Sequence, residues 1–185
     1  MPRDPRYDIL FEPVRIGPVT APNRFYQTPH ATGFGWQRPQ SGAALRGVKA
    51  EGGWGVVCTE YCSIHPTSDD IPAPFASLWD EGDARNMAVM AEAVHAHGAL
   101  AGVELWHGGL RSSNLQSRET SLGPQSLPTA SDPWQCARMD LTDIRMLRQW
   151  HRAAALRARA AGMDIVDVYA AHTYLLAQFL DRDIN

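Results

Sequence analysis

Four short segments place polar or aromatic side chains directly after apolar runs, and chemistry is expected there. They are Thr28-Pro29-His30, Glu60-Tyr61-Cys62, Glu104-Leu105-Trp106-His107 and Tyr169-Ala170-Ala171-His172-Thr173-Tyr174. Carboxyl, phenol and imidazole groups transfer protons and hold polar ligands, whereas aromatic faces bind flat or cationic groups. A lone residue of this kind is more often structural. The segments therefore indicate a functional site only if the fold brings them together.

The surrounding pattern alternates strand-like and helix-like segments. Strands are expected at 24–28, 54–64, 99–105 and 163–168, and helices at 42–51, at 84–96 and from Asp140 to Gly162. Asp83 and Asp140 are the expected N-caps of the second and third helices. A loop at 110–139, rich in Ser, Pro, Gly and Gln, separates the third strand from the third helix, and loops of this length are usually functional or disordered.

This alternation predicts an α/β protein with a parallel sheet, either an open doubly wound sheet or a (β/α)8 TIM barrel. No G-x-G-x-x-G follows the first strand, which disfavours a dinucleotide-binding open sheet. A complete barrel needs roughly 250 residues. We expect residues 1–185 to be the N-terminal part of a barrel domain, with about the first four βα units and without strands five to eight. In either architecture the strand ends meet at one edge, so the four polar segments should line one pocket for a flat or cationic ligand.

Composition narrows the class of protein. The chain is 44% hydrophobic and 20% charged, with a net charge of -3 and no basic stripe in the sequence, so no nucleic-acid partner is expected. No run approaches the roughly 20 apolar residues of a membrane span. The charged, proline-broken beginning resembles neither a signal peptide nor a transit peptide. A cytoplasmic protein with no membrane partner is expected.

The cysteines and the remaining histidines suggest no further site. Cys58, Cys62 and Cys136 are an odd number, which favours free thiols, and their spacing fits no zinc or iron-sulfur pattern. No metal site is expected, and Cys58 is interpreted as a small buried apolar residue. Four histidines are interpreted as structural or solvated: His65, His95, His97 and His151.

Longer motifs carry a family resemblance over almost the whole chain. They are DILFEPVRIGPVTAPNRFYQTPH, KAEGGWGVVCTEYCSIHPTSDD, WDEGDARN, HGALAGVELWHGG and AGMDIVDVYAAHTYLLAQFL. In this order they resemble the flavin oxidoreductases of the Old Yellow Enzyme family, and most closely its trimethylamine and dimethylamine dehydrogenase branch. The resemblance implies a TIM barrel with FMN across the carboxyl ends of its strands.

The resemblance also assigns residues to the cofactor. Thr28, Pro29, His30 and Ala31 would line FMN, Tyr61 and Cys62 would border its ring, and Glu104 would face the polar pyrimidine edge. The amine dehydrogenases attach FMN through a cysteine where this chain has Ala31, so FMN is expected to be noncovalent. The family's phosphate-binding strand ends, and any [4Fe-4S] cluster, would belong to sequence beyond residue 185. The 185-residue chain alone is expected to be inactive and to bind FMN weakly or not at all.

The resemblance implies a reaction as well. Tyr169 and His172 would be the catalytic pair beneath a substrate that Tyr61 and Tyr174 also contact, with Trp106 contributing. A tyrosine followed by a histidine is the amine dehydrogenase form. The implied reaction is N-demethylation of a small methylated amine, such as trimethylamine or dimethylamine, through an iminium. A flavoprotein or NAD(P) would take the electrons, and the full-length protein is expected to be a homo-oligomer.

Two alternatives stay open. An NAD(P)H-dependent ene or 2,4-dienoyl reductase is favoured by Ala31 and by His107, where the amine branch has a tyrosine, and is opposed by Tyr169 and Glu104. The second alternative is a catalytically silent half-barrel remnant kept as an interaction module.

Overall fold

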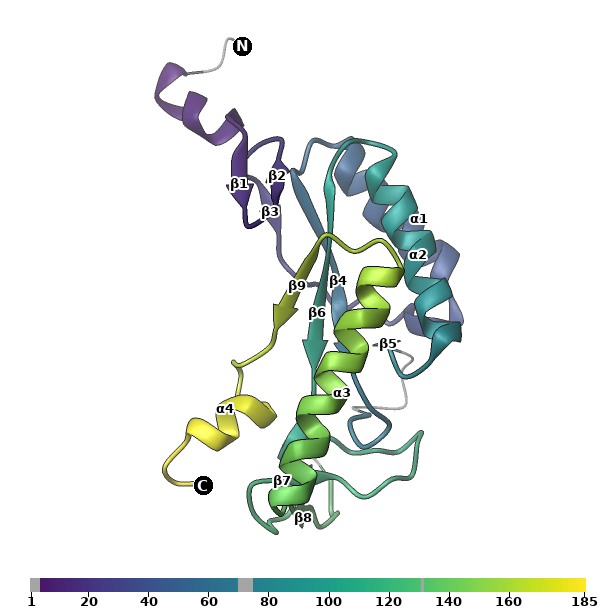
Figure 1. The fold of residues 1–185 in the computed structure, drawn as a ribbon, viewed down its shortest axis with the longest axis vertical. Coiled ribbons are helices and arrows are strands. Elements are labelled where there is room, and N and C mark those ends of the chain that lie inside the picture. Colours follow the sequence, from purple (N-terminus) through teal and green to yellow (C-terminus); the bar gives the residue numbers. More distant parts are fainter. Residues whose placement is uncertain (1–3, 70–74, 131) are drawn as a thin grey trace.

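One parallel sheet organises the chain. The computed structural model describes residues 4–69, 75–130 and 132–185. Four strands lie side by side in chain order: β3 (Tyr26–Gln27), β4 (Val56–Ser63), β6 (Leu100–Trp106) and β9 (Ile165–Val168) (Figure 1). A doubly wound sheet reverses its strand order, whereas a barrel adds each strand beside the previous one. The prediction of a partial barrel is therefore confirmed, and the open-sheet alternative is wrong.

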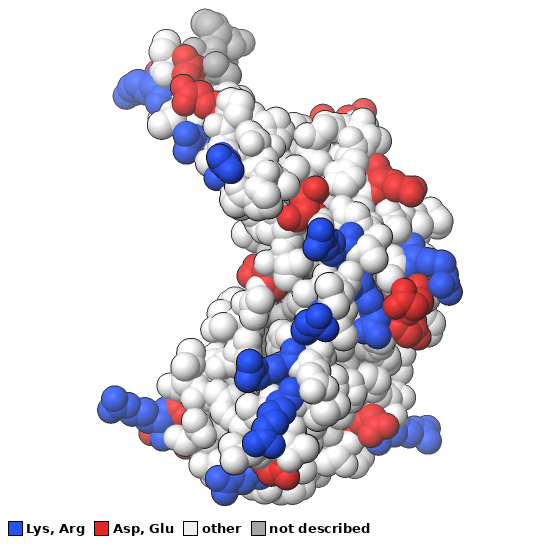
Figure 2. Space-filling model, viewed as in Figure 1, with Lys and Arg blue, Asp and Glu red and all other residues white. Residues whose placement is uncertain are grey.

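Helices cover one face of this sheet. They are α1 (Pro39–Glu51), α2 (Glu81–His95) and α3 (Leu141–Ala160), all on the same side in Figure 1. The opposite face is concave, and Figure 2 shows the hollow it forms. In a barrel this concave face is the interior, so its residues are the ones that can meet a ligand at the strand ends.

Short elements sit at the two ends of the sheet. The amino end carries η1 (Pro5–Phe11) and an antiparallel hairpin of β1 (Val14–Ile16) and β2 (Val19–Ala21). At the carboxyl end, β5 (Ala76–Ser77) extends the sheet beside β4, and α4 (Leu175–Leu180) follows β9. Figure 1 separates these ends clearly, with the hairpin at one extreme and α4 near the other.

Alternation along the strands builds two cores. On the outer face, Val57 and Val103 are fully buried in the large cluster that packs against the helices. On the inner face, Val56 and Cys58 form a smaller cluster with Ala21 of the hairpin. Fully burying a valine side chain stabilises by about 1.5–3 kcal/mol, so both faces contribute to folding.

A β-bulge in β4 decides which side chains reach the inner face. The register between β4 and β6 shifts between Cys58 and Tyr61. Simple alternation from Cys58 would turn Glu60 inward and Tyr61 outward. The extra residue reverses this, so Tyr61 stands opposite Glu104.

The helix starts differ from two sequence predictions. α2 begins at Glu81, because the Asp80 carboxylate accepts the backbone N–H groups of Gly82 (2.7 Å) and Asp83 (3.1 Å). Asp83, the predicted cap, instead lies in the first turn and accepts the Trp79 N–H (2.8 Å). Both aspartates have suitable chemistry, and only the path of the chain selects one. α1 begins at Pro39 rather than at residue 42, since proline suits a first helical position.

The start of α3 matches its prediction. Asp140 accepts the N–H groups of Thr142 (2.6 Å) and Asp143 (2.8 Å), and Asp143 accepts the Asp140 N–H (2.9 Å), which completes a capping box.

The loop at 110–139 is more ordered than the sequence indicates. It begins within η3 (Gly109–Arg111) and contains a short parallel pair of β7 (Leu122–Gly123) and β8 (Ala137–Arg138). The sequence analysis found no basic stripe, but the structure has a row of basic side chains along α3, visible in Figure 2. Its exposed arginines are separated in sequence but share a helix face by spacing: Arg145, Arg148, Arg152 and Arg159.

Candidate active site at the carboxyl end of the sheet

A row of three polar side chains crosses the inner face near the strand ends. Tyr61 is the register neighbour of Glu104, which is the register neighbour of Asp167. Burial, together with the nearby Asp167 carboxylate, raises the pKa of Glu104 to about 7. A carboxyl group with this pKa can exist in either protonation state near neutral pH, so a bound partner can select the state.

Asp167 was not predicted as a site residue, although the sequence contains a pattern that indicates it. It interrupts the apolar run of β9 two residues before Tyr169. Residues two apart in a strand face the same side, so Asp167 was predictable as a neighbour of the pocket.

Tyr169 and His172 form a contacting pair. The Tyr169 hydroxyl lies 2.5 Å from His172 Nδ1, and the two rings meet edge-on with centroids 5.5 Å apart. Burial is the main cause that raises the pKa of Tyr169 to about 12, with Glu104 adding to it, so the phenol keeps its proton at neutral pH. The pair can therefore share or pass a proton between an oxygen and a nitrogen.

A chain of aromatic rings connects the pair to Tyr61 on β4. Trp106 is almost fully buried and packs against Tyr61 (centroids 4.9 Å apart) and Tyr174 (5.3 Å), while Tyr174 also meets Tyr169 (5.0 Å). The Trp106 Nε1–H has no hydrogen-bond acceptor among the described residues. Buried donors are normally satisfied, so an unpaired one at a strand end is compatible with a further bound group.

The predicted cofactor segment follows β3 at the same end. Thr28, His30 and Ala31 are exposed, and Pro29 is half-buried. Its backbone is held in place, because the His30 N–H donates to the Thr59 carbonyl (3.1 Å) and the His30 carbonyl accepts from the Arg46 guanidinium.

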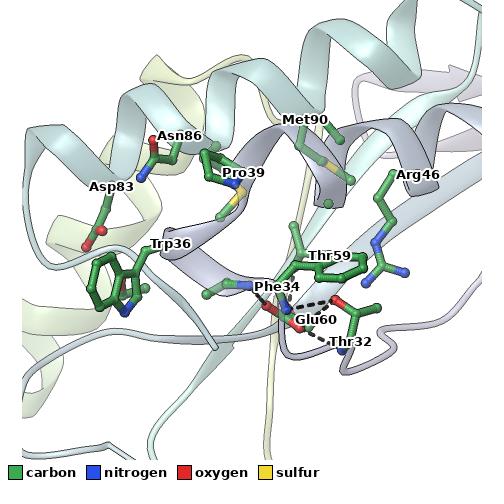
Figure 3. A pocket seen from close by; sticks show the side chains of 16 residues that line it. Thr32, Phe34, Trp36, Pro39, Arg46, Thr59, Glu60, Asp83, Asn86 and Met90 are labelled. Atoms are coloured by element: carbon green, nitrogen blue, oxygen red, sulfur yellow. Dashed lines mark hydrogen bonds between the residues drawn. The ribbon is translucent and has the colours of Figure 1, made fainter. Parts of the chain in front are cut away.

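Glu60 anchors the loop that follows this segment. Its carboxylate accepts the backbone N–H groups of Thr32 (2.8 Å), Gly33 (3.2 Å) and Gly35 (3.0 Å), and the Thr32 hydroxyl (3.1 Å). Figure 3 shows this carboxylate at the base of a pocket between the loop, α1 and α2. The bulge turns Glu60 toward the loop, so its role could not be read from strand alternation.

Cys62 is not brought to the inner face. Its side chain is fully buried in the outer core, and burial raises the pKa of its thiol well above the usual range. Only its main chain can face a ligand on the concave side. Cys58 and Cys136 are likewise buried free thiols.

His107 also lies outside the polar row, although its segment is one of the four. It is buried, and its Nε2 contacts the Thr67 hydroxyl (3.1 Å). Burial lowers the pKa of His107 to about 3, so the imidazole is neutral.

Two of the other histidines have structural partners that the sequence did not reveal. His65 stacks on Trp150 with centroids 3.7 Å apart, and His95 Nε2 lies 2.7 Å from Asp164 Oδ2. Within residues 4–69, 75–130 and 132–185, no three His, Cys, Asp or Glu side chains gather as metal ligands would. No helix in the same ranges is both long enough and apolar enough to cross a bilayer.

Comparison with known proteins places this arrangement in a family. Residues 9–185 match the NADH:flavin oxidoreductase / NADH oxidase family. The chain belongs to this family, as the sequence motifs indicated.

Amine-oxidising enzymes are among its relatives. The chain is 46% identical to dimethylamine dehydrogenase of Hyphomicrobium sp. (strain x), over 100% of this chain and 26% of the relative. The structure of histamine dehydrogenase from Rhizobium sp. 4-9 matches 99% of this chain and 29% of that chain, with a TM-score of 0.95 and 44% identity. The structure of 6-hydroxypseudooxynicotine amine oxidase from Pseudomonas geniculata N1 matches 99% of this chain and 28% of that chain, with a TM-score of 0.95 and 48% identity. The chain thus spans between a quarter and a third of these relatives.

Proposed function

We propose that this chain is part of an FMN-dependent oxidoreductase that oxidises a small methylated amine, such as dimethylamine or trimethylamine, and removes a methyl group. The observation that carries the proposal is the Tyr169–His172 contact of 2.5 Å at the end of β9. Identity of 44–48% to proteins named as amine dehydrogenases or an amine oxidase supports the same reaction class.

The pair can prepare the substrate by moving one proton. A methylated amine is mostly an ammonium ion at neutral pH and must lose its N–H proton before a C–H bond can be oxidised. The ammonium N–H donates to the Tyr169 oxygen, while the Tyr169 proton passes to His172 Nδ1. The products are a neutral amine and an imidazolium, and exposed His172 releases its proton to solvent.

Oxidation then removes a hydride from a methyl carbon, which leaves an iminium. Water adds to the iminium, and the adduct separates into formaldehyde and the smaller amine. FMN, when bound, accepts the two electrons of the hydride.

The residues at the strand ends fit such a cofactor. The segment from Thr28 to Ala31 offers fixed main chain, and Glu104 offers a carboxyl group whose pKa of about 7 lets it donate to or accept from a polar ring edge. Alanine at position 31 cannot form a thioether to the flavin, so the proposed binding is noncovalent. Tyr61 and Tyr174 supply aromatic faces, which attract methylated ammonium groups by roughly 0.5–2 kcal/mol each. Trp106, almost fully buried, contributes by packing against both rings.

The test uses the protein expressed with the sequence that naturally flanks it. Its visible spectrum is recorded without oxygen, before and after dimethylamine or trimethylamine is added. We expect flavin bands that the amine bleaches and that pass through a filter after denaturation. A flavin that no methylated amine reduces would contradict the proposal.

A second candidate is an NAD(P)H-dependent ene or dienoyl reductase of the same family. Relatives named NADPH dehydrogenase match 92% of this chain or more at 25–28% identity. Consumption of NADPH with an enone, together with no amine oxidation, would select this candidate. A colourless folded protein would instead select the silent remnant.

A further inference from the structure

We propose that Gln178 is a positioning residue for the Tyr169–His172 pair, because its side-chain amide fixes the turn that carries His172. The catalytic meaning of the pair rests on the proposed function. The positioning itself rests on backbone geometry and hydrogen bonds among described residues, and nothing in the sequence had singled Gln178 out.

The turn needs external support. His172 and Thr173 are consecutive residues with φ of 51° and 57°, both in the left-handed region. Side-chain-bearing residues adopt this region rarely, and a β-branched threonine is a clear outlier there. Such backbone persists only where surrounding contacts over-determine it.

Gln178 supplies these contacts from α4. Its side chain is almost fully buried, and its Nε2 donates to the Thr173 carbonyl (2.6 Å) and to the Gly108 carbonyl (3.0 Å). Its Oε1 accepts the Leu110 N–H (3.0 Å). One amide therefore joins the His172–Thr173 turn to the backbone that follows β6, and it uses both of its hydrogens to do so.

The opposing backbone is shaped to receive this amide. Gly109 has φ of 62°, and a Cβ there would collide with Gln178 Oε1, so only glycine suits this position. A second contact acts on the same turn, because Arg111 Nη1 donates to the Thr173 hydroxyl (3.0 Å). Without the Gln178 donors, Thr173 can relax toward an ordinary φ, which swings the His172 ring away from the Tyr169 hydroxyl.

Gln178→Met tests the inference in the full-length, flavin-loaded protein, with Gln149→Met on the exposed face of α3 as the matched control. Methionine keeps the length of the side chain and removes the amide. We expect unchanged flavin content, a fall in kcat for dimethylamine of about 10- to 100-fold, since small misplacements have effects of this size, and a smaller change in KM. The pH profile of kcat/KM should also shift, whereas Gln149→Met should leave both unchanged.

An NMR measurement makes the test independent of turnover. In protein carrying 15N-labelled histidine, the Nδ1 resonance of His172, assigned by its loss in His172→Gln, should move toward that of a free imidazole in Gln178→Met. An enzyme inactive on amines would contradict the proposed function and leave this readout intact.

An unchanged His172 resonance in folded Gln178→Met would overturn the inference. Gln178→Glu provides a second variant of the same shape that loses both N–H donors, and the same shift is expected. If neither variant folds, Gln178 is a general structural residue and the positioning role is overturned.

Discussion

The inner face of the sheet changes character between its two ends. At the amino end, Val56 and Cys58 pack against Ala21 of the hairpin, and Tyr26 contacts the Cys58 sulfur through its hydroxyl (3.2 Å). Two or three residues further along the same strands, the inner face carries Tyr61 and Glu104.

The backbone is the same parallel ladder at both ends, so the difference lies in the side chains and in what closes each end. A hairpin covers the amino end and removes it from solvent. The carboxyl end is bordered by loops and by the exposed His172 turn. In barrels the first kind of end serves stability and the second serves chemistry.

The largest expected difference between the two ends is catalytic. Tyr169→Phe removes the hydroxyl through which the proposed proton transfer passes, so kcat/KM for a methylated amine should fall by about 10²–10⁴-fold. Tyr26→Phe removes the same atom at the amino end and should leave the rate within about twofold. Steady-state kinetics on both flavin-loaded variants measures kcat/KM. Equal losses of kcat/KM in the two variants would contradict a functional difference between the two ends of the sheet.

Stability, in contrast to the rate, should depend on the side chains at the amino end of the sheet. Val56→Ala at the amino end deletes two buried methyl groups and should lower the free energy of unfolding by about 2 kcal/mol. Val48→Ala on the exposed side of α1 is the matched control and should change it by less than about 0.5 kcal/mol. Urea titration of the two variants measures both values. A Val56→Ala protein as stable as the parent would mean that the small inner cluster does not support the fold.

A third prediction concerns pH and Glu104. Its pKa is raised from the usual carboxyl value of 4.5 to about 7 in the folded chain, chiefly by burial, so the folded state holds this proton more tightly than the unfolded state. The contribution of this proton to the free energy of unfolding is fully present below pH 4.5 and is lost as the pH rises through about 7.

Glu104→Gln should remove this loss, and the apoprotein of the variant should lose less stability than the parent between about pH 5 and pH 7.5. Glu92→Gln, on the exposed side of α2, should lose as much stability as the parent over the same pH range. Unfolding titrations at the two pH values make the comparison. Equal losses of stability in Glu104→Gln and the parent would contradict a raised pKa of Glu104.

The smallest expected effect concerns a polar residue that serves only structure. Asp140→Ala removes the N-cap of α3 and should cost about 1 kcal/mol of stability, with flavin content and kcat unchanged. Its neighbour Thr142, exposed in the first turn, provides the control Thr142→Ala. Thermal unfolding and kinetics are measured together. A loss of activity without a loss of stability would place Asp140 among the functional residues instead.

Much of the site could be predicted from local patterns. The apolar bodies and polar ends of the strands placed Tyr61, Glu104 and Tyr169 at one edge, and the motifs named their family. The capping of α3 by Asp140 was also predictable, because a cap depends on only a few neighbouring residues. The choice of Asp80 over Asp83 was not, since both are chemically suitable.

Long-range register accounts for the other misses. The bulge that exchanges Glu60 and Tyr61 depends on how β4 pairs with β6, which no single segment encodes. The structural partners of His65 and His95 come from distant elements, Trp150 on α3 and Asp164 before β9.

By itself, the sequence determined the parallel α/β class and the chemistry available at the strand ends, because periodicity and residue type act locally. Only the tertiary structure decided that Cys62 faces the helices, that Asp167 shares a wall with Glu104 and that Gln178 supports the His172 turn. These facts depend on strand register and on packing between residues far apart in the chain, because those long-range contacts fix the direction of each side chain.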